Sequence, residues 1–147
     1  MMNAKQTILL VEDNPDDELL TLRALKKQNI ANEVVVARDG ESALDYLFGS
    51  GPYVGRDTSE LPQLVLLDLN LPLKSGLDVL RELRADPRTR LLPIVILTSS
   101  HEDEDVVNGY ALGVNAYVRK PVDFNQFNDA VKTLGMFWLL LNEAPRR

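Results

Sequence analysis

Five polar residues stand directly after short apolar runs, and their types could together carry phosphoryl chemistry: Glu12, Asp13, Asp68, Thr98 and Lys120. An ionised carboxylate is costly to bury without a partner, and clustered carboxylates repel one another unless a cation or a proton neutralises them. Mg²⁺ prefers oxygen ligands and usually keeps a place for a phosphate oxygen. An aspartate carboxylate can also accept a phosphoryl group as an acyl phosphate. If the fold brings these side chains together, they predict a phosphoryl-accepting site that uses a divalent cation.

The residues between these polar groups predict the elements that position them. Short apolar runs predict five strands, and apolar spacings of three and four predict helices that alternate with them and follow the last. The expected strands are 7–11, 33–37, 64–68, 93–98 and 115–119, and the expected helices are 15–28, 40–48, 75–86, 103–112 and 123–142. Strands that are apolar throughout are typical of parallel strands covered on both faces. The pattern therefore predicts an α/β fold with a doubly wound, five-stranded parallel sheet and five helices. Ligands bind at the carboxyl ends of such strands, where the five polar residues stand.

The composition excludes several classes of function. The 147 residues, of which 45% are hydrophobic, suffice for one domain, which we place at 1–147. The chain has no cysteine, which excludes disulfides, thiolate metal sites and cysteine nucleophiles. A formal net charge of −6 argues against a nucleic-acid partner. The N-terminus does not read as a signal peptide, and no apolar run approaches the roughly 20 residues that span a bilayer. We expect a soluble, cytoplasmic protein with neither a nucleic-acid nor a membrane partner.

Two local patterns need separate interpretation. The segment 49–62 contains three glycines and two prolines, which predicts a long inserted surface loop. Asn14 is a good helix cap and Pro15 suits a first helical position. Asp16 and Asp17 then fit the first turn, where the helix dipole favours acids. By this interpretation Glu12 and Asp13, which precede the cap, are the site candidates.

Four motifs, VEDN, LLDLNLP, ILTSS and YVRKP, occur in this order along the predicted strands. With them the chain resembles the receiver domain of two-component response regulators over nearly its whole length. The resemblance implies that Asp68 is the phosphoacceptor and that Asp13 binds Mg²⁺ directly. It implies that Glu12 is the acidic neighbour, contacting the metal through water, and that the backbone carbonyl of Asn70 is the third protein ligand. Mn²⁺ or Ca²⁺ could take the place of Mg²⁺.

The same resemblance implies a conformational switch. Thr98 corresponds to the hydroxyl that moves toward the phosphoryl group, and Lys120 to the lysine that binds it. Tyr117 corresponds to the aromatic residue that turns inward when Thr98 moves, and the bond before Pro121 is typically cis. The implied phosphoryl donor is a phosphohistidine on a sensor histidine kinase.

Two differences from compact receivers indicate which subgroup of the family this chain resembles. The interval between Asp13 and Asp68 is longer, and the surplus is the 49–62 loop. The chain also ends soon after the last predicted helix, without an output domain, so that we expect a stand-alone receiver. The loop and the ending MFWLLLNE resemble the small regulators partnered with phytochromes, and we therefore expect a light-sensing phosphorelay with a phytochrome as the possible kinase.

The 123–142 segment predicts an extended helix with more apolar surface than one core-facing stripe requires. The core-facing positions would be Phe124, Phe127, Val131, Leu134, Trp138 and Leu141. Other apolar residues are left on its other faces, which indicates either an interface or burial on several sides. We expect a homodimer through this helix, with Phe137, Trp138 and Leu140 at the dimer or partner surface. The alternative is an extended intramolecular core.

Other interpretations remain open. Asp68 taken alone could cap a turn, and His101, the only histidine, fits an exposed loop residue better than a donor or metal ligand. A phosphorylation-independent pseudo-receiver usually loses an acid, the threonine or the lysine, and none is lost here. A phosphatase with an aspartyl nucleophile would need a second acid two positions later, where this chain has Asn70. We therefore expect a self-phosphorylating switch and not an enzyme with an external substrate.

Overall fold

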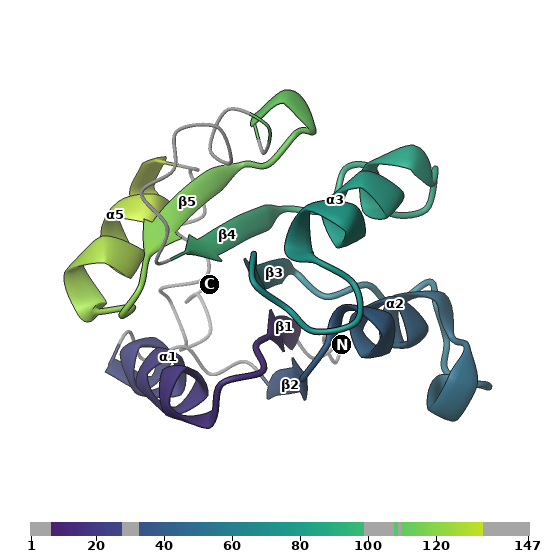
Figure 1. Ribbon diagram of the computed structural model, residues 1–147, viewed down its shortest axis with the longest axis horizontal. Coiled ribbons are helices and arrows are strands. Elements are labelled where there is room, and N and C mark those ends of the chain that lie inside the picture. The colour runs from purple at the N-terminus through teal and green to yellow at the C-terminus, as the bar shows by residue number, and fades with distance from the viewer. Residues whose placement is uncertain (1–6, 28–32, 99–107, 109, 134–147) are drawn as a thin grey trace, which may run out of the picture.

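The computed structural model describes residues 7–27, 33–98, 108 and 110–133. Its centre is a five-stranded sheet (Figure 1) whose strands are β1 (Thr7–Val11), β2 (Glu33–Ala37), β3 (Leu64–Asp68), β4 (Ile94–Thr98) and β5 (Ala116–Arg119). All neighbouring strands are parallel, in the order β2-β1-β3-β4-β5. This order reverses between β1 and β3, as in other doubly wound sheets. The predicted α/β fold is confirmed.

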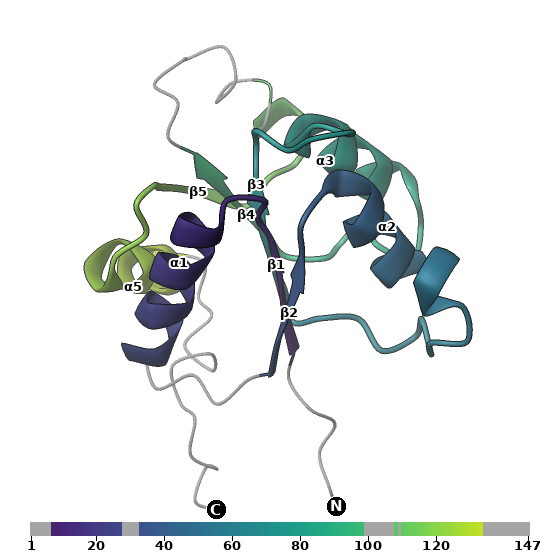
Figure 2. The ribbon, with the colours of Figure 1, turned by 60° about the horizontal axis from the view of Figure 1, so that its bottom comes forward.

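Helices cover both faces of the sheet. Figure 2 shows α1 (Pro15–Lys27) and α5 (Phe124–Thr133) on one side, and α2 (Gly40–Phe48) and α3 (Gly76–Ala85) on the other. Alternate residues of β3 enter the two cores. Leu64 and Leu66 pack on the side of α1 and α5, whereas Val65 and Leu67 pack on the side of α2 and α3. Burial on both sides explains why this strand is apolar at every position before its last.

The described helices and strands match the expected ranges closely. The strand expected at 93–98 begins at Ile94, because Pro93 has no N–H to donate to a ladder. Within the helix expected at 103–112, Asn108, Tyr110 and Ala111 are helical and the other positions before 110 lie outside the described residues. Phe127 of α5 is buried, as expected, and Ala130, which was not among the expected core-facing positions, is buried as well. The description of α5 ends at Thr133, so the proposed dimer surface of Phe137, Trp138 and Leu140 lies outside the described residues, as does His101. In the part of the chain that is described, no helix is long and apolar enough to cross a membrane.

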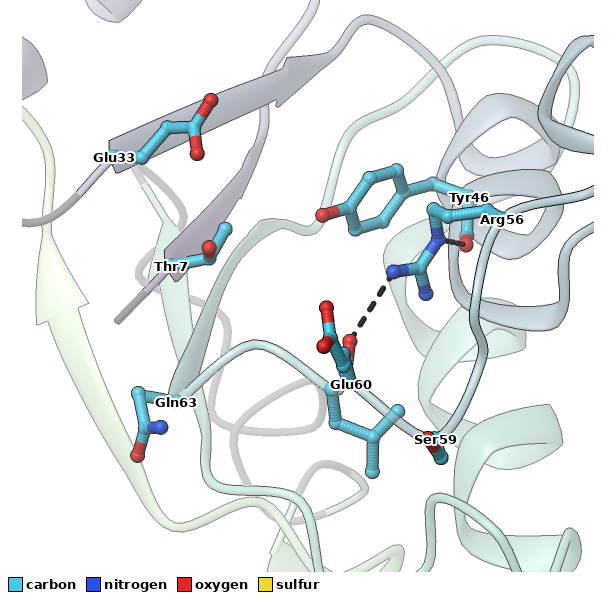
Figure 3. Close-up of a pocket in the computed structure, with 8 residues that line it drawn as sticks. Thr7, Glu33, Tyr46, Arg56, Ser59, Glu60 and Gln63 are labelled. Atoms are coloured by element: carbon cyan, nitrogen blue, oxygen red, sulfur yellow. Dashed lines mark hydrogen bonds between the residues drawn. The ribbon is translucent and has the colours of Figure 1, made fainter. Parts of the chain in front are cut away.

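The 49–62 segment is folded onto the end of α2. It contains the short 3₁₀ helix η1 (Gly51–Tyr53), which the sequence did not predict. Arg56 donates hydrogen bonds from Nε to the carbonyl oxygen of Tyr46 at 2.7 Å and from Nη1 to that of Glu60 at 3.1 Å. Its guanidinium also lies 4.1 Å from the centre of the Tyr46 ring. Together with the amino ends of β1 and β2, the segment lines an open pocket of about 540 Å³ (Figure 3).

Candidate phosphoacceptor site

Three carboxylates meet at the carboxyl edge of the sheet. Val11 lies opposite Leu67 in the parallel register of β1 and β3, so that the residues following both positions emerge together. The ligand oxygens of Glu12, Asp13 and Asp68 all lie within 4.8 Å of one another. Glu12 is 0% exposed and Asp68 is 2% exposed, whereas Asp13 is open to solvent. The structure thus brings together the three acids that the sequence predicted.

The chain after Asp68 is held tightly against α3. The amide of Gly76 donates to the carbonyl oxygen of Leu69 at 3.0 Å. A Cβ atom at Gly76 would lie 2.2 Å from the backbone oxygen of Asp68, so only glycine fits there without a shift of the backbone. The amide of Asn70 donates to Oδ1 of Asp68 at 3.1 Å, which fixes the orientation of the carboxylate.

Lys120 lies among three carboxylates and is only 9% exposed. Its Nζ is 3.0 Å from Oε1 of Glu12, 3.2 Å from Oδ2 of Asp68 and 2.9 Å from Oδ2 of Asp17. The peptide bond from Lys120 to Pro121 is cis, as the resemblance implied. The sequence did not predict Asp17 as a site residue, because an acid in the first turn of a helix equally fits an interaction with the helix dipole.

The site carries more negative charge than Lys120 neutralises. Burial raises the pKa of Glu12 to about 7; the hydrogen bond from Lys120 opposes this rise, and the neighbouring charge of Asp68 adds to it. Burial lowers the pKa of Lys120, but its contacts with Asp17 and Glu12 and the charge of Asp68 outweigh burial and raise the pKa well above its ordinary value. At neutral pH Lys120 is therefore charged, while Glu12 keeps its proton to a higher pH than an ordinary glutamate does.

This excess of negative charge suits a divalent cation. Three carboxylates whose oxygens lie within 4.8 Å of one another form an all-oxygen donor set, which hard cations such as Mg²⁺ and Mn²⁺ prefer. A cation at Glu12, Asp13 and Asp68 would keep Glu12 ionised by replacing the proton that otherwise neutralises it. The residues present therefore fit a bound divalent metal ion.

Thr98 and Tyr117 occupy the two strands next to the acids. Thr98 ends β4, is 5% exposed and follows Leu97, which lies opposite Asp68 in the register of β3 and β4. Its carbonyl oxygen accepts a hydrogen bond from the amide of Lys120 at 2.9 Å. Tyr117 is half-buried on β5, and its ring lies edge-on to that of Tyr110 with the ring centres 5.0 Å apart. Thr98 thus belongs to the same edge of the sheet as Asp68, whereas Tyr117 lies further back along its strand.

Comparison with known proteins agrees with this geometry. Residues 8–132 match the response regulator receiver domain, and the chain therefore belongs to this family. Receiver-domain regulators are signalling proteins that receive phosphate from histidine kinases and bind a divalent metal in an acidic pocket. The chain is 39% identical to the response regulator Rcp1 of a Synechocystis species over 137 residues, which cover 93% of this chain and 91% of Rcp1.

Solved structures of phytochrome-associated regulators have the same fold. The bacteriophytochrome response regulator AtBRR superposes with a TM-score of 0.85 at 55% identity, covering 96% of this chain and all of that one. The Mn²⁺-bound form of Rcp1 gives a TM-score of 0.76 at 38% identity, covering 96% of this chain and 99% of that one. The phosphorylated cyanobacterial phytochrome response regulator RcpA gives a TM-score of 0.77 at 39% identity, covering 97% of this chain and 100% of that one.

Proposed function

We propose that this protein is a phosphorylation-switched response regulator whose Asp68 accepts a phosphoryl group from a phosphohistidine of a sensor histidine kinase. The observation that carries the proposal is the placement of Asp68. Its carboxylate is 3% exposed at the end of the central strand, 3.2 Å from a buried ammonium group and beside two further acids. A purely structural aspartate would not need such an arrangement, because a carboxylate that caps a turn needs only a backbone amide to accept from.

In the transfer step, a carboxylate oxygen of Asp68 forms a bond to phosphorus while the bond between phosphorus and the imidazole nitrogen breaks. The electron pair of that bond leaves with the imidazole. Lys120 offers its ammonium group to the phosphoryl oxygens and stabilises their negative charge. Mg²⁺, when bound by Glu12, Asp13, Asp68 and the backbone carbonyl of Asn70, supplies further positive charge that offsets repulsion between the acids and the phosphoryl group.

The phosphorylated state then differs from the resting state in the contacts of Thr98. A phosphoryl oxygen on Asp68 offers the Thr98 hydroxyl an acceptor, and the movement of Thr98 gives Tyr117 room to turn inward. The hydrogen bond from Lys120 to the carbonyl oxygen of Thr98 supports this coupling, because it joins the ends of β4 and β5. A ligand shifts such an equilibrium only by binding one state better, which the new phosphoryl contacts provide.

We further propose that the kinase is a phytochrome, which makes this protein a cytoplasmic element of a light-sensing phosphorelay. The support is the names of its relatives, which describe regulators of bacterial and cyanobacterial phytochromes. We also propose a homodimer through the last helix, with Phe137, Trp138 and Leu140 at its surface. Sedimentation velocity of the full chain at micromolar concentration, with and without phosphorylation, tests this proposal, and a monomer under both conditions contradicts it.

The decisive experiment is labelling by acetyl phosphate in the presence of Mg²⁺, followed by intact-mass spectrometry. The wild-type protein should gain one phosphoryl group, and chelation of the metal should suppress the gain. Asp68→Asn should not be labelled, whereas Asp78→Asn, which alters an exposed acid of α3 paired with Arg81, should be labelled like the wild type. A wild-type protein that remains unlabelled would refute the proposed function.

A further inference from the structure

Asp17 is a fourth carboxylate at the site, and it makes the shortest ion pair with Lys120. The Nζ atom lies 2.9 Å from Oδ2 of Asp17, compared with 3.0 Å from Glu12 and 3.2 Å from Asp68. Among the described residues, Asp17 is not part of the group of acids that could hold a metal ion. Its contact is therefore with the lysine that the proposed reaction uses.

The start of α1 fixes the backbone of Asp17. The side chain of Asn14 accepts hydrogen bonds from the amides of Asp16 at 2.8 Å and Asp17 at 3.1 Å, which caps the helix. The carboxylate of Asp17 is therefore not needed as a cap. Its backbone stays in place whether or not its side chain contacts Lys120.

Exposure distinguishes Asp17 from the other two partners of Lys120. The side chain of Asp17 is 30% exposed, whereas Glu12 is 0% and Asp68 is 3% exposed. A carboxylate that loses its ion-pair partner needs solvent to stabilise its charge. A buried carboxylate would instead be left as an uncompensated charge, which is strongly unfavourable. Of the three, Asp17 is the partner that Lys120 can release most easily.

An ammonium group has three N–H donors, and here three carboxylates surround it. A phosphoryl group on Asp68 brings further acceptor oxygens and more negative charge to the same place. We infer that Asp17 holds Lys120 in the resting protein and gives it up to the phosphoryl group. Asp17 is thus a positioning residue that restrains the phosphorylation of Asp68. This inference rests on the proposed function.

The direction of the effect follows from the two states. The ion pair with Asp17 stabilises the resting protein, and in the phosphorylated protein the same carboxylate competes with the phosphoryl oxygens for Lys120. Its negative charge also repels an anionic phosphoryl donor. Asp17→Asn removes the charge and keeps the size of the side chain. The loss of a partly exposed ion pair changes an equilibrium by about twofold to fivefold. We expect the phosphorylation of Asp68 in Asp17→Asn to gain by this factor.

The test compares initial rates of labelling by acetyl phosphate with Mg²⁺. In this reaction Asp68 forms a bond to phosphorus, the bond from phosphorus to the acetyl oxygen breaks, and acetate leaves with the electron pair. We expect Asp17→Asn to be labelled about twofold to fivefold faster than the wild type. As a second readout, apparent affinity for beryllofluoride, a phosphoryl mimic followed by fluorine NMR, should tighten by a similar factor. A merely structural role of Asp17 would not produce either gain.

Two variants serve as controls. Asp16→Asn removes the same charge from the same turn of α1 at an exposed position next to Asp17, and its labelling rate should stay close to that of the wild type. Asp17→Glu retains the charge and should be labelled more slowly than Asp17→Asn. The inference is wrong if the wild type is labelled but Asp17→Asn is no faster than Asp16→Asn, or if Asp17→Glu is as fast as Asp17→Asn. A wild type that is not labelled contradicts the proposed function instead.

Discussion

Arg56 lies at the amino edge of the sheet and Lys120 at the carboxyl edge, and these two cations differ in what surrounds them. At the amino edge, Arg56 donates to the backbone carbonyl oxygens of Tyr46 and Glu60. At the carboxyl edge, Lys120 lies against three carboxylates and is only 9% exposed. Backbone carbonyls bear no charge that a reaction can change, whereas carboxylates can bind a metal, a proton or a phosphoryl group.

The comparison shows how to separate a structural cation from a reactive one. The hydrogen bonds of Arg56 go to uncharged backbone carbonyl oxygens and attach the 49–62 loop to α2, while its Nη2 atom is buried without a hydrogen-bond partner among the described residues. Lys120 offers one positive charge to three carboxylates, so the site keeps excess negative charge, and burial raises the pKa of Glu12 to about 7. A buried site that remains electrostatically unbalanced favours an added cation, and perturbed pKa values of this kind are typical of functional sites.

The sharpest test replaces each cation in turn. Lys120→Ala should lower the rate of labelling by acetyl phosphate by about 10²- to 10³-fold, the usual cost of losing one preorganised donor to developing charge. Arg56→Ala should stay within about twofold of the wild type, because its contacts lie at the opposite edge of the sheet. The measurement is the initial rate of labelling, followed by mass spectrometry. Similar losses of rate in both variants would contradict the distinction between a structural and a reactive cation.

Alanine substitutions at two glycines test how tightly the chain is packed beside Asp68 and in the 49–62 loop. Gly76→Ala places a Cβ atom 2.2 Å from the backbone oxygen of Asp68, and overpacking of this kind should lower the free energy of unfolding by about 3 kcal/mol. Gly55 in the loop has a φ of +95°, but nothing lies within 4 Å of its Cβ position. Gly55→Ala should therefore cost only the backbone strain, about 1 kcal/mol. Urea denaturation measures both values, and equal losses would mean that the packing around Asp68 is looser than the structure shows.

The raised pKa of Glu12 predicts a pH dependence of stability that arises at the carboxyl edge. The pKa rises from 4.5 to about 7 on folding, so the folded protein holds this proton more tightly than the unfolded chain does. The contribution of Glu12 to the free energy of unfolding is therefore fully present below pH 4.5 and is lost as the pH rises through about 7. With the metal chelated, we expect a loss on the order of 2 kcal/mol over this range.

Variants at both edges isolate this effect. Glu12→Gln cannot ionise and should flatten the decline in urea titrations made across the pH range. Glu60→Gln, which changes an exposed acid at the amino edge, should retain the decline. Addition of Mg²⁺ should reduce the decline in the wild type, because a bound cation stabilises the ionised acid. A steep decline that persists in Glu12→Gln would assign it to another group.

The smallest expected effect concerns the loop itself. Arg56→Met keeps the aliphatic length of the side chain but removes two hydrogen bonds to backbone oxygens and the contact with the Tyr46 ring. We expect a loss of about 1 kcal/mol in the free energy of unfolding. Hydrogen exchange should rise in the segment 49–62 and stay unchanged at β3. Increased exchange at β3 as well would show that the loop supports the sheet.

Much of this arrangement followed from local patterns in the sequence. The five apolar runs predicted the parallel sheet, because a strand buried on both faces must be apolar throughout. Parallel strands share one carboxyl edge, so the placement of Glu12, Asp13 and Asp68 followed from the fold class alone. The interior of the 49–62 segment was not predicted, since the contacts of Arg56 depend on how the loop returns to α2.

The sequence by itself determined which residues stand at the carboxyl ends of the strands, since the apolar runs and the positions where they end depend on residue types at short range. Only the tertiary structure decided which acids share Lys120. Asp16 and Asp17 are chemically identical neighbours in the first turn of α1, yet of the two it is Asp17 that pairs with this lysine. The reason is geometric: successive residues of a helix point about 100° apart, and the position of the start of α1 at the carboxyl edge of the sheet selects which of them reaches Lys120.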